Sequence, residues 1–344
     1  MPSSSVATTF HFDEAIPFVV PLNRRFRGVT QREGVLLRIG RNWGEWAPFP
    51  EYDDQVAARW LHAAFEAAAG DWPTPIRDSV GVNAIIPAVG PSEAAIMTRD
   101  AVLLDGCEFV KVKVGEPNQH FTDDVARIAA VRAALDECGA ESARIRIDVN
   151  GLWTVDEAVD RIEILNDLAD GLEYVEQPCR TLEEMAIVKS RVSVGLAVDE
   201  GLRLAGALDD ELVTQIRDAA DVLILKAIPL GGVRTCLAIA QRVALPITVS
   251  GSMDTSIGLA AALALATSLP DEPLACGMGT GRLLAKDLTE ETLTPQHGRL
   301  SYMRLTPDPL SLADARVALA ADRVTWWNDR LMRVRNYLEE SVSS

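Results

Sequence analysis

Short hydrophobic runs alternate with amphipathic stretches along most of the chain, from about Val80 onward. The repeat of roughly 22 to 35 residues is typical of βα units rather than of a β-meander. We therefore predict eight strands, at residues 80–87, 108–114, 144–149, 172–177, 195–199, 221–227, 245–250 and 273–277.

The stretches between these runs have apolar residues at three- and four-residue spacing, which predicts helices. The clearest are residues 123–137, 154–168, 182–191, 208–219, 232–243 and 256–267. Eight parallel strands joined by crossover helices predict an α/β fold with a closed TIM-type barrel.

The two ends of the chain follow a different pattern. Residues 8–20 and 33–45 are predicted strands and 55–69 a helix, while 310–340 contain a further helical stretch. The tail is too short for a domain of its own. We predict an α+β capping domain at 1–78, with the tail 305–344 packed on it, and a barrel domain at 79–304.

Composition excludes several classes of function. The formal charge is −17, from 50 acidic and 33 basic residues, with no basic cluster suited to nucleic acid. The five cysteines include no C-x-x-C pair, which disfavours a zinc knuckle or a disulfide framework. No apolar run approaches the roughly 20 residues of a membrane span, and the first residues do not resemble a signal peptide. We expect a soluble, cytoplasmic protein that binds neither nucleic acid nor membrane, of undetermined oligomeric state.

Charged residues stand at the ends of five consecutive predicted strands. Functional side chains of a TIM-type barrel project from the carboxyl ends of its strands into one shared mouth. These residues are Lys111 and Lys113, Asp148, Glu176, Asp199 and Lys226. Any one of them alone is as consistent with a helix cap or a solvated lysine.

Together, the three carboxylates predict a metal site. Asp148, Glu176 and Asp199 would converge from adjacent strands, where their repulsion is costly unless a cation lies among them. Three oxygen ligands without Cys or His favour Mg²⁺, with Mn²⁺ possible, over zinc.

The lysines predict proton transfer next to a substrate carboxylate. Lys111 and Lys113 are two residues apart on a strand and so point to one face, while Lys226 approaches from the opposite side. Lysine is a base near neutral pH only when burial or nearby cations lower its pKa from about 10.4, and the enolate that forms requires a cation on the carboxylate oxygens. The alternative is that the lysines only neutralise the acidic cluster.

The ordered series Lys-x-Lys, Asp-x-Asn, Glu-Gln-Pro, Asp-Glu and Lys resembles the muconate lactonizing subgroup of the enolase superfamily. The resemblance covers nearly the whole chain. It implies a (β/α)7β barrel with an α+β cap, and a metal-assisted lysine base acting on a small-molecule carboxylate substrate.

Within the subgroup, the segments RFRGVT at 25–30, REG at 32–34 and WGEWAPF at 43–49 resemble the actinobacterial o-succinylbenzoate synthase family. This resemblance implies dehydration of 2-succinyl-6-hydroxy-2,4-cyclohexadiene-1-carboxylate to 2-succinylbenzoate in menaquinone biosynthesis. Lys113 would remove the proton and then protonate the departing hydroxyl, while Lys226 would stay cationic and stabilise the enolate.

Further residues are candidate substrate contacts. The glycine run at 277–281 could be a backbone-amide cradle or a tight turn, and Arg27 could reach the substrate from the cap or be solvated. The predicted contacts are Lys111, Asn150, Arg27, Ser250, Gly251, Ser252, Gly277 and Gly279.

Other functions stay open at this point. No histidine lies between His120 and His297, unlike in mandelate-racemase-like enzymes, and no Asp-x-Asp marks the eighth strand, unlike in dipeptide epimerases. An N-succinylamino acid racemase would use the same two lysines. A Schiff-base aldolase with Lys226 as its nucleophile, or a non-catalytic metal-binding barrel, are the alternatives from other classes.

Overall fold

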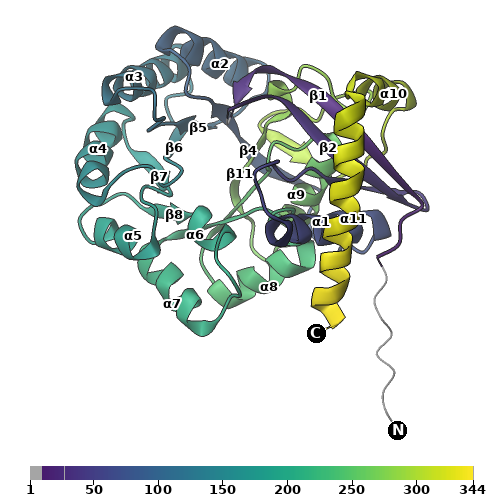
Figure 1. Cartoon of the computed structure of the whole chain (residues 1–344). Helices are drawn as coiled ribbons and strands as arrows, with labels where there is room; N and C mark the ends of the chain where they lie inside the picture. The colour runs from purple at the N-terminus through teal and green to yellow at the C-terminus, as the bar shows by residue number, and fades with distance from the viewer. Residues whose placement is uncertain (1–9, 27, 344) are drawn as a thin grey trace.

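The computed structural model describes residues 10–26 and 28–343, and these form a closed barrel with an antiparallel sheet beside it (Figure 1). The barrel strands pair in chain order, and the last pairs with the first. They are β4 (Ser79–Ile86), β5 (Phe109–Lys113), β6 (Arg144–Asp148), β7 (Leu172–Glu176), β8 (Leu196–Val198), β9 (Val222–Leu225), β10 (Ile247–Ser250) and β11 (Leu274–Gly279). The predicted TIM-type barrel is confirmed.

Helices surround the barrel on its outside, as Figure 1 shows. They are α2 (Pro91–Leu103), α3 (Phe121–Glu137), α4 (Val155–Leu168), α5 (Leu182–Lys189), α7 (Asp210–Ala219), α8 (Val233–Val243) and α9 (Ser256–Ser268). The short α6 (Glu200–Arg203) lies inside this ring, next to the end of β8. After β11 come a 3₁₀ turn, η1 (Gly281–Leu283), and β12 (Arg299–Ser301), which pairs antiparallel with β4.

Local sequence explains these elements. Strands such as β9 are buried on both faces, which suits their continuous apolar runs. Thr154 and Thr181 begin α4 and α5 with capping boxes, in which side chains satisfy the free amides of the first turn. No helix among the described residues is long and apolar enough to cross a membrane.

The cap differs in detail from the prediction. Its sheet has three strands, β1 (Glu14–Phe26), β2 (Val29–Ile39) and β3 (Asn42–Trp46), and is followed by α1 (Asp54–Ala69). The single strand predicted at 33–45 was wrong, because the chain reverses at Gly40, whose φ of 59° suits a tight turn. The tail forms two helices, α10 (Pro309–Ala318) and α11 (Ala321–Ser343).

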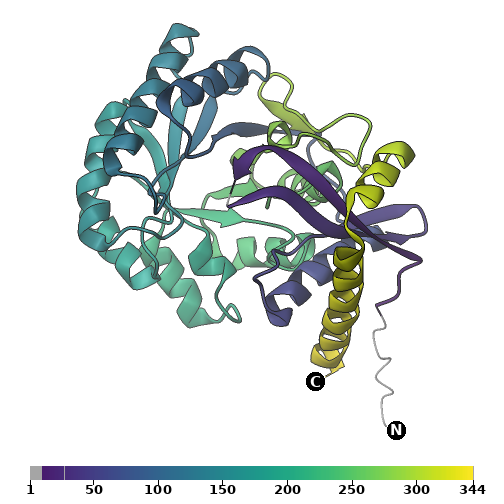
Figure 2. The same ribbon diagram turned by 45° about the horizontal axis from the view of Figure 1, so that its top comes forward.

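The tail helices pack on the cap, α10 against β1 and α11 against both α1 and β1 (Figure 2). The guanidinium of Arg330 on α11 is buried, and its Nη2 donates to the carbonyls of Phe49 at 3.1 Å and Tyr52 at 2.7 Å. It also stacks on the rings of Trp46 and Trp326. Burial lowers the pKa of Arg330 to about 10. One arginine therefore joins the tail to the loop before α1.

Replacing Arg330 by leucine should destabilise the fold by roughly 3 kcal/mol, because buried carbonyls lose their donors. The matched change Arg333→Leu on the same helix removes only a solvent-exposed pair with Asp54 and should cost under about 1 kcal/mol. Urea denaturation of both variants measures the difference. Equal losses would contradict this role for Arg330.

Glu45 on β3 joins the cap to the barrel. Its carboxylate is buried at the start of α9 and accepts hydrogen bonds from Thr255 N and, at 3.1 Å, from Gly258 N. Burial, and then the charge of Asp254, raise the pKa of Glu45 to about 8, although Thr255 and Arg32 act in the opposite direction.

Glu45 should therefore make the folded state less stable as pH rises. The folded protein holds this proton up to about pH 8, whereas the unfolded chain loses it near its ordinary value of 4.5. Between these values the free energy of unfolding should fall by up to about 1.4 kcal/mol per pH unit from this group. Urea denaturation from pH 5.5 to 8 should show a shallower fall in Glu45→Gln. Identical slopes in the two proteins would refute the assignment.

Candidate active site

The pairing register of the parallel strands places the predicted strand-end residues side by side at one end of the barrel. Lys113 on β5 pairs with Asp148 on β6, and Asp148 pairs with Glu176 on β7. Asp199 directly follows β8 and Lys226 directly follows β9. The five predicted catalytic and metal-ligating residues therefore surround one end of the barrel.

Ion pairs connect these side chains. Lys111 Nζ lies 2.9 Å from Glu176 Oε2 and 3.1 Å from Asp148 Oδ2. Lys113 Nζ donates to Asp148 Oδ2 at 2.6 Å. Lys226 Nζ forms a short ion pair with Asp199 Oδ2. Every carboxylate of the cluster thus has an ammonium partner.

The site is buried, and its charges are strongly coupled. The side chains of Asp148, Glu176 and Asp199 are 1%, 0% and 1% exposed. Burial, and then the charge of Asp148, raise the pKa of Glu176 to about 7. Burial would also raise the pKa of Asp148, but the charges of Lys113 and Lys111 outweigh it and hold this pKa below its usual range.

Burial and neighbouring charges also act in opposite directions on the pKa values of Asp199 and Lys111. Burial would raise the pKa of Asp199, but the charges of Lys226 and Arg203 outweigh it and lower the pKa. Burial would lower the pKa of Lys111, yet the charges of Glu176 and Asp148 raise it above the ordinary lysine value. Lys111 therefore stays protonated between two carboxylates.

The donor set fits a hard divalent cation. Asp148, Glu176 and Asp199 offer carboxylate oxygens without sulfur or imidazole, as Mg²⁺ prefers. The position of Lys111 Nζ between two of them shows that this mouth holds positive charge. In this structure the carboxylates pair with lysines instead. Among the described residues, no three His, Cys, Asp or Glu side chains are grouped so that they could hold a metal ion.

Strained backbone follows two of the strand-end carboxylates. Asn150 and Gln177 adopt φ values of 53° and 42°, which are uncommon outside glycine and gather at functional sites. The amide oxygen of Gln177 accepts from the backbone N–H groups of Asp199 and Gly201, both at 3.1 Å. The glutamine thereby fixes the backbone that presents Asp199.

A small cavity of about 40 Å³ lies over these groups. Three predicted contacts from the loop after β10, Ser250, Gly251 and Ser252, line it. Lys111, Asn150 and the two predicted catalytic lysines, Lys113 and Lys226, line it too. The hydroxyls of Ser252 and Thr280 are buried and have no hydrogen-bond partner among the described residues, so they are available to a ligand.

The remaining predicted contacts have different environments. Gly277 and Gly279 lie in β11 rather than in a turn, and the cavity lining does not include them. A Cβ would stand 2.6 Å from the Ser250 hydroxyl at Gly277, and 2.6 Å from the Asn83 carbonyl at Gly279. Close strand packing thus explains both glycines. Arg27 falls outside the described residues.

Sequence reasoning assigned no role to several residues of the site. Thr280 and Phe26 line the cavity, and Arg203 contacts Asp199. Thr280 could have been found from the sequence, because it is a polar residue at the end of the eighth predicted strand, within the glycine run at 277–281. Arg203 gave none, because its proximity depends on the short helix α6.

Comparison with family models agrees with this arrangement. Residues 93–307 match the model described as Enolase C-terminal domain-like, and residues 18–68 match Enolase N-terminal domain-like.

Curated relatives resemble almost the whole chain. An o-succinylbenzoate synthase of Thermobifida fusca is 47% identical over 94% of this chain and 96% of its own length. An o-succinylbenzoate synthase of Mycolicibacterium smegmatis is 42% identical over 91% of this chain and 92% of its own length.

Solved structures share the fold at low sequence identity. The L-Ala-D/L-Glu epimerase of Bacillus subtilis has a TM-score of 0.71 at 20% identity, covering 86% of this chain and 96% of its own. The N-succinyl Arg/Lys racemase of Bacillus cereus has a TM-score of 0.72 at 17% identity, covering 88% and 96%. The family models show that the chain belongs to the enolase superfamily, and the curated relatives show that within it the chain belongs to the o-succinylbenzoate synthase family.

Proposed function

We propose that this enzyme dehydrates 2-succinyl-6-hydroxy-2,4-cyclohexadiene-1-carboxylate to 2-succinylbenzoate in menaquinone biosynthesis. The observation that supports it most directly is the placement of Lys113 and Lys226. Strands β5 and β9 stand four apart in the closed order of eight, so the two lysines approach the mouth from opposite sides. The relatives named o-succinylbenzoate synthase support the choice of substrate.

Asp148, Glu176 and Asp199 would hold a divalent cation, which we propose is Mg²⁺, with Mn²⁺ as the alternative. When bound, the cation would withdraw negative charge from the substrate carboxylate. Lys111 would stay protonated beside Glu176 and Asp148 and add positive charge at the same end of the mouth.

Lys113 would act as both base and acid. In the structure its Nζ is held by Asp148 Oδ2 at 2.6 Å and Asn150 Oδ1 at 2.7 Å, so it must exchange a contact to reach the substrate. The neutral amine takes the proton alpha to the ring carboxylate. The resulting ammonium then gives a proton to the departing hydroxyl, so one C–H and one C–O bond break, water leaves and the ring becomes aromatic.

Lys226 would remain cationic. Its ammonium forms an ion pair with Asp199 and would stabilise negative charge developing on the substrate. Ser252 and Thr280, whose hydroxyls have no hydrogen-bond partner among the described residues, would donate to a substrate carboxylate from the cavity wall. Ser250 would first have to give up its hydrogen bond to the Gly277 carbonyl.

A racemase of N-succinylamino acids is the second candidate. The observation that favours it is the equivalence of the two lysines, since each pairs with one buried aspartate from a neighbouring strand. Racemisation requires Lys226 to exchange protons as Lys113 does.

The first test compares wild type and Lys113→Ala on the cyclohexadiene substrate with Mg²⁺ and after EDTA treatment. Loss of the base should lower kcat by about 10²- to 10⁴-fold. EDTA should abolish turnover and added Mg²⁺ should restore it. Lys286→Ala, at an exposed lysine, is the control. A wild-type enzyme without turnover, or one fully active in EDTA, would overturn the proposal.

Lys226→Arg separates dehydration from racemisation. Arginine keeps the positive charge but does not give up its proton. We expect dehydration to fall by less than about 100-fold, while interconversion of the two enantiomers of an N-succinylamino acid should be lost, because it needs a proton donor on each face. Chiral chromatography follows the interconversion. Racemisation that persists in this variant would exclude Lys226 as a racemisation base.

A further inference from the structure

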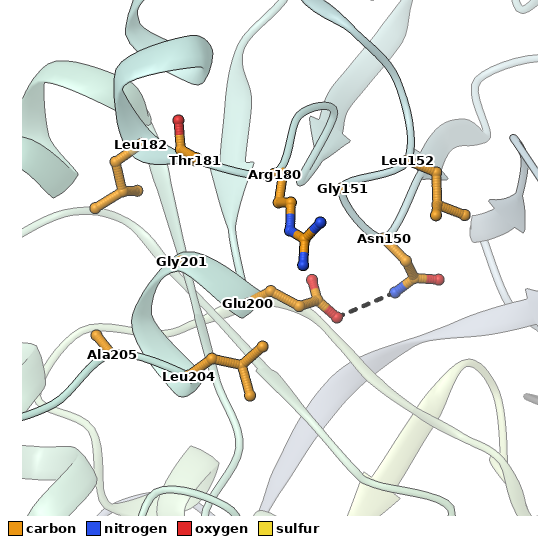
Figure 3. A pocket seen from close by; sticks show the side chains of 10 residues that line it. All are labelled: Asn150, Gly151, Leu152, Arg180, Thr181, Leu182, Glu200, Gly201, Leu204 and Ala205. Atoms are coloured by element: carbon orange, nitrogen blue, oxygen red, sulfur yellow. Dashed lines mark hydrogen bonds between the residues drawn. The ribbon is translucent and has the colours of Figure 1, made fainter.

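Asn150 contacts Lys113 through only one end of its side-chain amide. Its Oδ1 accepts from Lys113 Nζ at 2.7 Å, and its Nδ2 donates to Glu200 Oε1 at 3.2 Å (Figure 3). An asparagine amide turned by half a rotation would present NH₂ to the ammonium and lose this bond. The orientation of Asn150 therefore matters for Lys113.

Glu200 determines that orientation. An ionised carboxylate only accepts hydrogen bonds, so it selects the NH₂ end of Asn150 and leaves the carbonyl end for Lys113. Glu200 is itself held by Arg203, whose Nη2 donates to the same Oε1 at 2.9 Å.

Arg203 connects the two sides of the mouth. Its guanidinium is buried and also contacts Asp199 Oδ1 at 3.3 Å, and Asp199 pairs with Lys226. A third contact, from Nη1 to the Tyr52 hydroxyl at 3.2 Å, reaches the cap. Burial would lower the pKa of Arg203, but the charges of Asp199 and Glu200 raise it, so the cation persists.

A second cavity, of about 570 Å³, lies beside Glu200. Asn150, Arg180 and Glu200 line it, and Figure 3 shows the guanidinium of Arg180 directed toward Glu200. Glu200 Oε2 is buried and has no hydrogen-bond partner among the described residues. An unpaired buried carboxylate oxygen is costly, which is uncommon for a residue that serves packing alone.

We propose that Glu200 and Arg203 are positioning residues for the lysine base. Glu200 orients Asn150, and Asn150 holds the Lys113 amine at the wall of the small cavity. Arg203 fixes Glu200 and Asp199 together, so that the two lysine environments depend on one guanidinium. The inference rests on the proposed role of Lys113 and adds residues that do not themselves touch the reacting atoms.

The test is Glu200→Gln in the full-length protein. A glutamine can offer either end of its amide and no longer selects the orientation of Asn150. We expect kcat for the cyclohexadiene substrate to fall about 10- to 100-fold, with KM within about 3-fold of wild type. Glu200→Asp keeps the acceptor at shorter reach and should give an intermediate kcat. The matched control is Glu183→Gln, an exposed carboxylate at the start of α5.

A second measurement needs neither metal nor turnover. Acetic anhydride acylates lysine amines that it can reach, so the labelling of Lys113 relative to exposed Lys286 reports how firmly hydrogen bonds hold the Lys113 amine in place. In metal-free protein we expect Glu200→Gln to raise this ratio at least about 3-fold and Glu183→Gln to leave it unchanged. Mass spectrometry quantifies both sites, and thermal unfolding checks that each variant is folded.

The two measurements separate the proposals. If the wild type does not turn over the substrate, the proposed function fails, and the labelling ratio still decides whether Glu200 positions Lys113. A ratio and a kcat both within about 2-fold of wild type, or a loss confined to KM, would overturn the positioning role.

Discussion

Three carboxylates that are almost completely removed from water meet at one end of the barrel, and this concentration of negative charge governs the site around it. In a low-dielectric interior, like charges on adjacent strands are tolerated only with positive charge between them. Lys111 supplies it between Asp148 and Glu176, while Lys113 and Lys226 supply it at the two flanks. Burial, and then the charge of Asp148, raise the pKa of Glu176 to about 7, whereas at Asp148 the charges of Lys113 and Lys111 outweigh burial and lower the pKa. A divalent cation would enter a site already organised for positive charge.

The cap and the tail also contact the residues around the charged mouth. Glu45 and Arg32 link the cap to the segment 253–258, next to the serines that line the cavity. Tyr52 contacts Arg203, and the Tyr52 backbone carbonyl accepts from Arg330 of the tail. The cap is therefore held by buried polar contacts at both the site and the tail. These directional contacts fix its orientation more closely than apolar packing alone would.

Much of the fold could be predicted from the sequence, because the periods of strands and helices are local properties. The strand predicted at 144–149 is Arg144–Asp148 in the structure, and the helix predicted at 154–168 is Val155–Leu168. The errors lie where one residue changes the chain direction. Gly40 divides the strand predicted at 33–45, since its positive φ leaves no trace in the hydrophobic pattern. The glycines of β11 were ambiguous, because the backbones that approach them come from other strands.

The sequence by itself determined the barrel class and the five charged strand ends, because parallel strands of one barrel necessarily bring their carboxyl ends to a common mouth. Only the tertiary structure decided which ammonium pairs with which carboxylate, and that Arg203, Glu200 and Asn150 form a connected path to Lys113. The reason is physical. Strand order follows from a periodic local pattern, whereas hydrogen-bond partners depend on side-chain directions and distances between segments far apart in the chain.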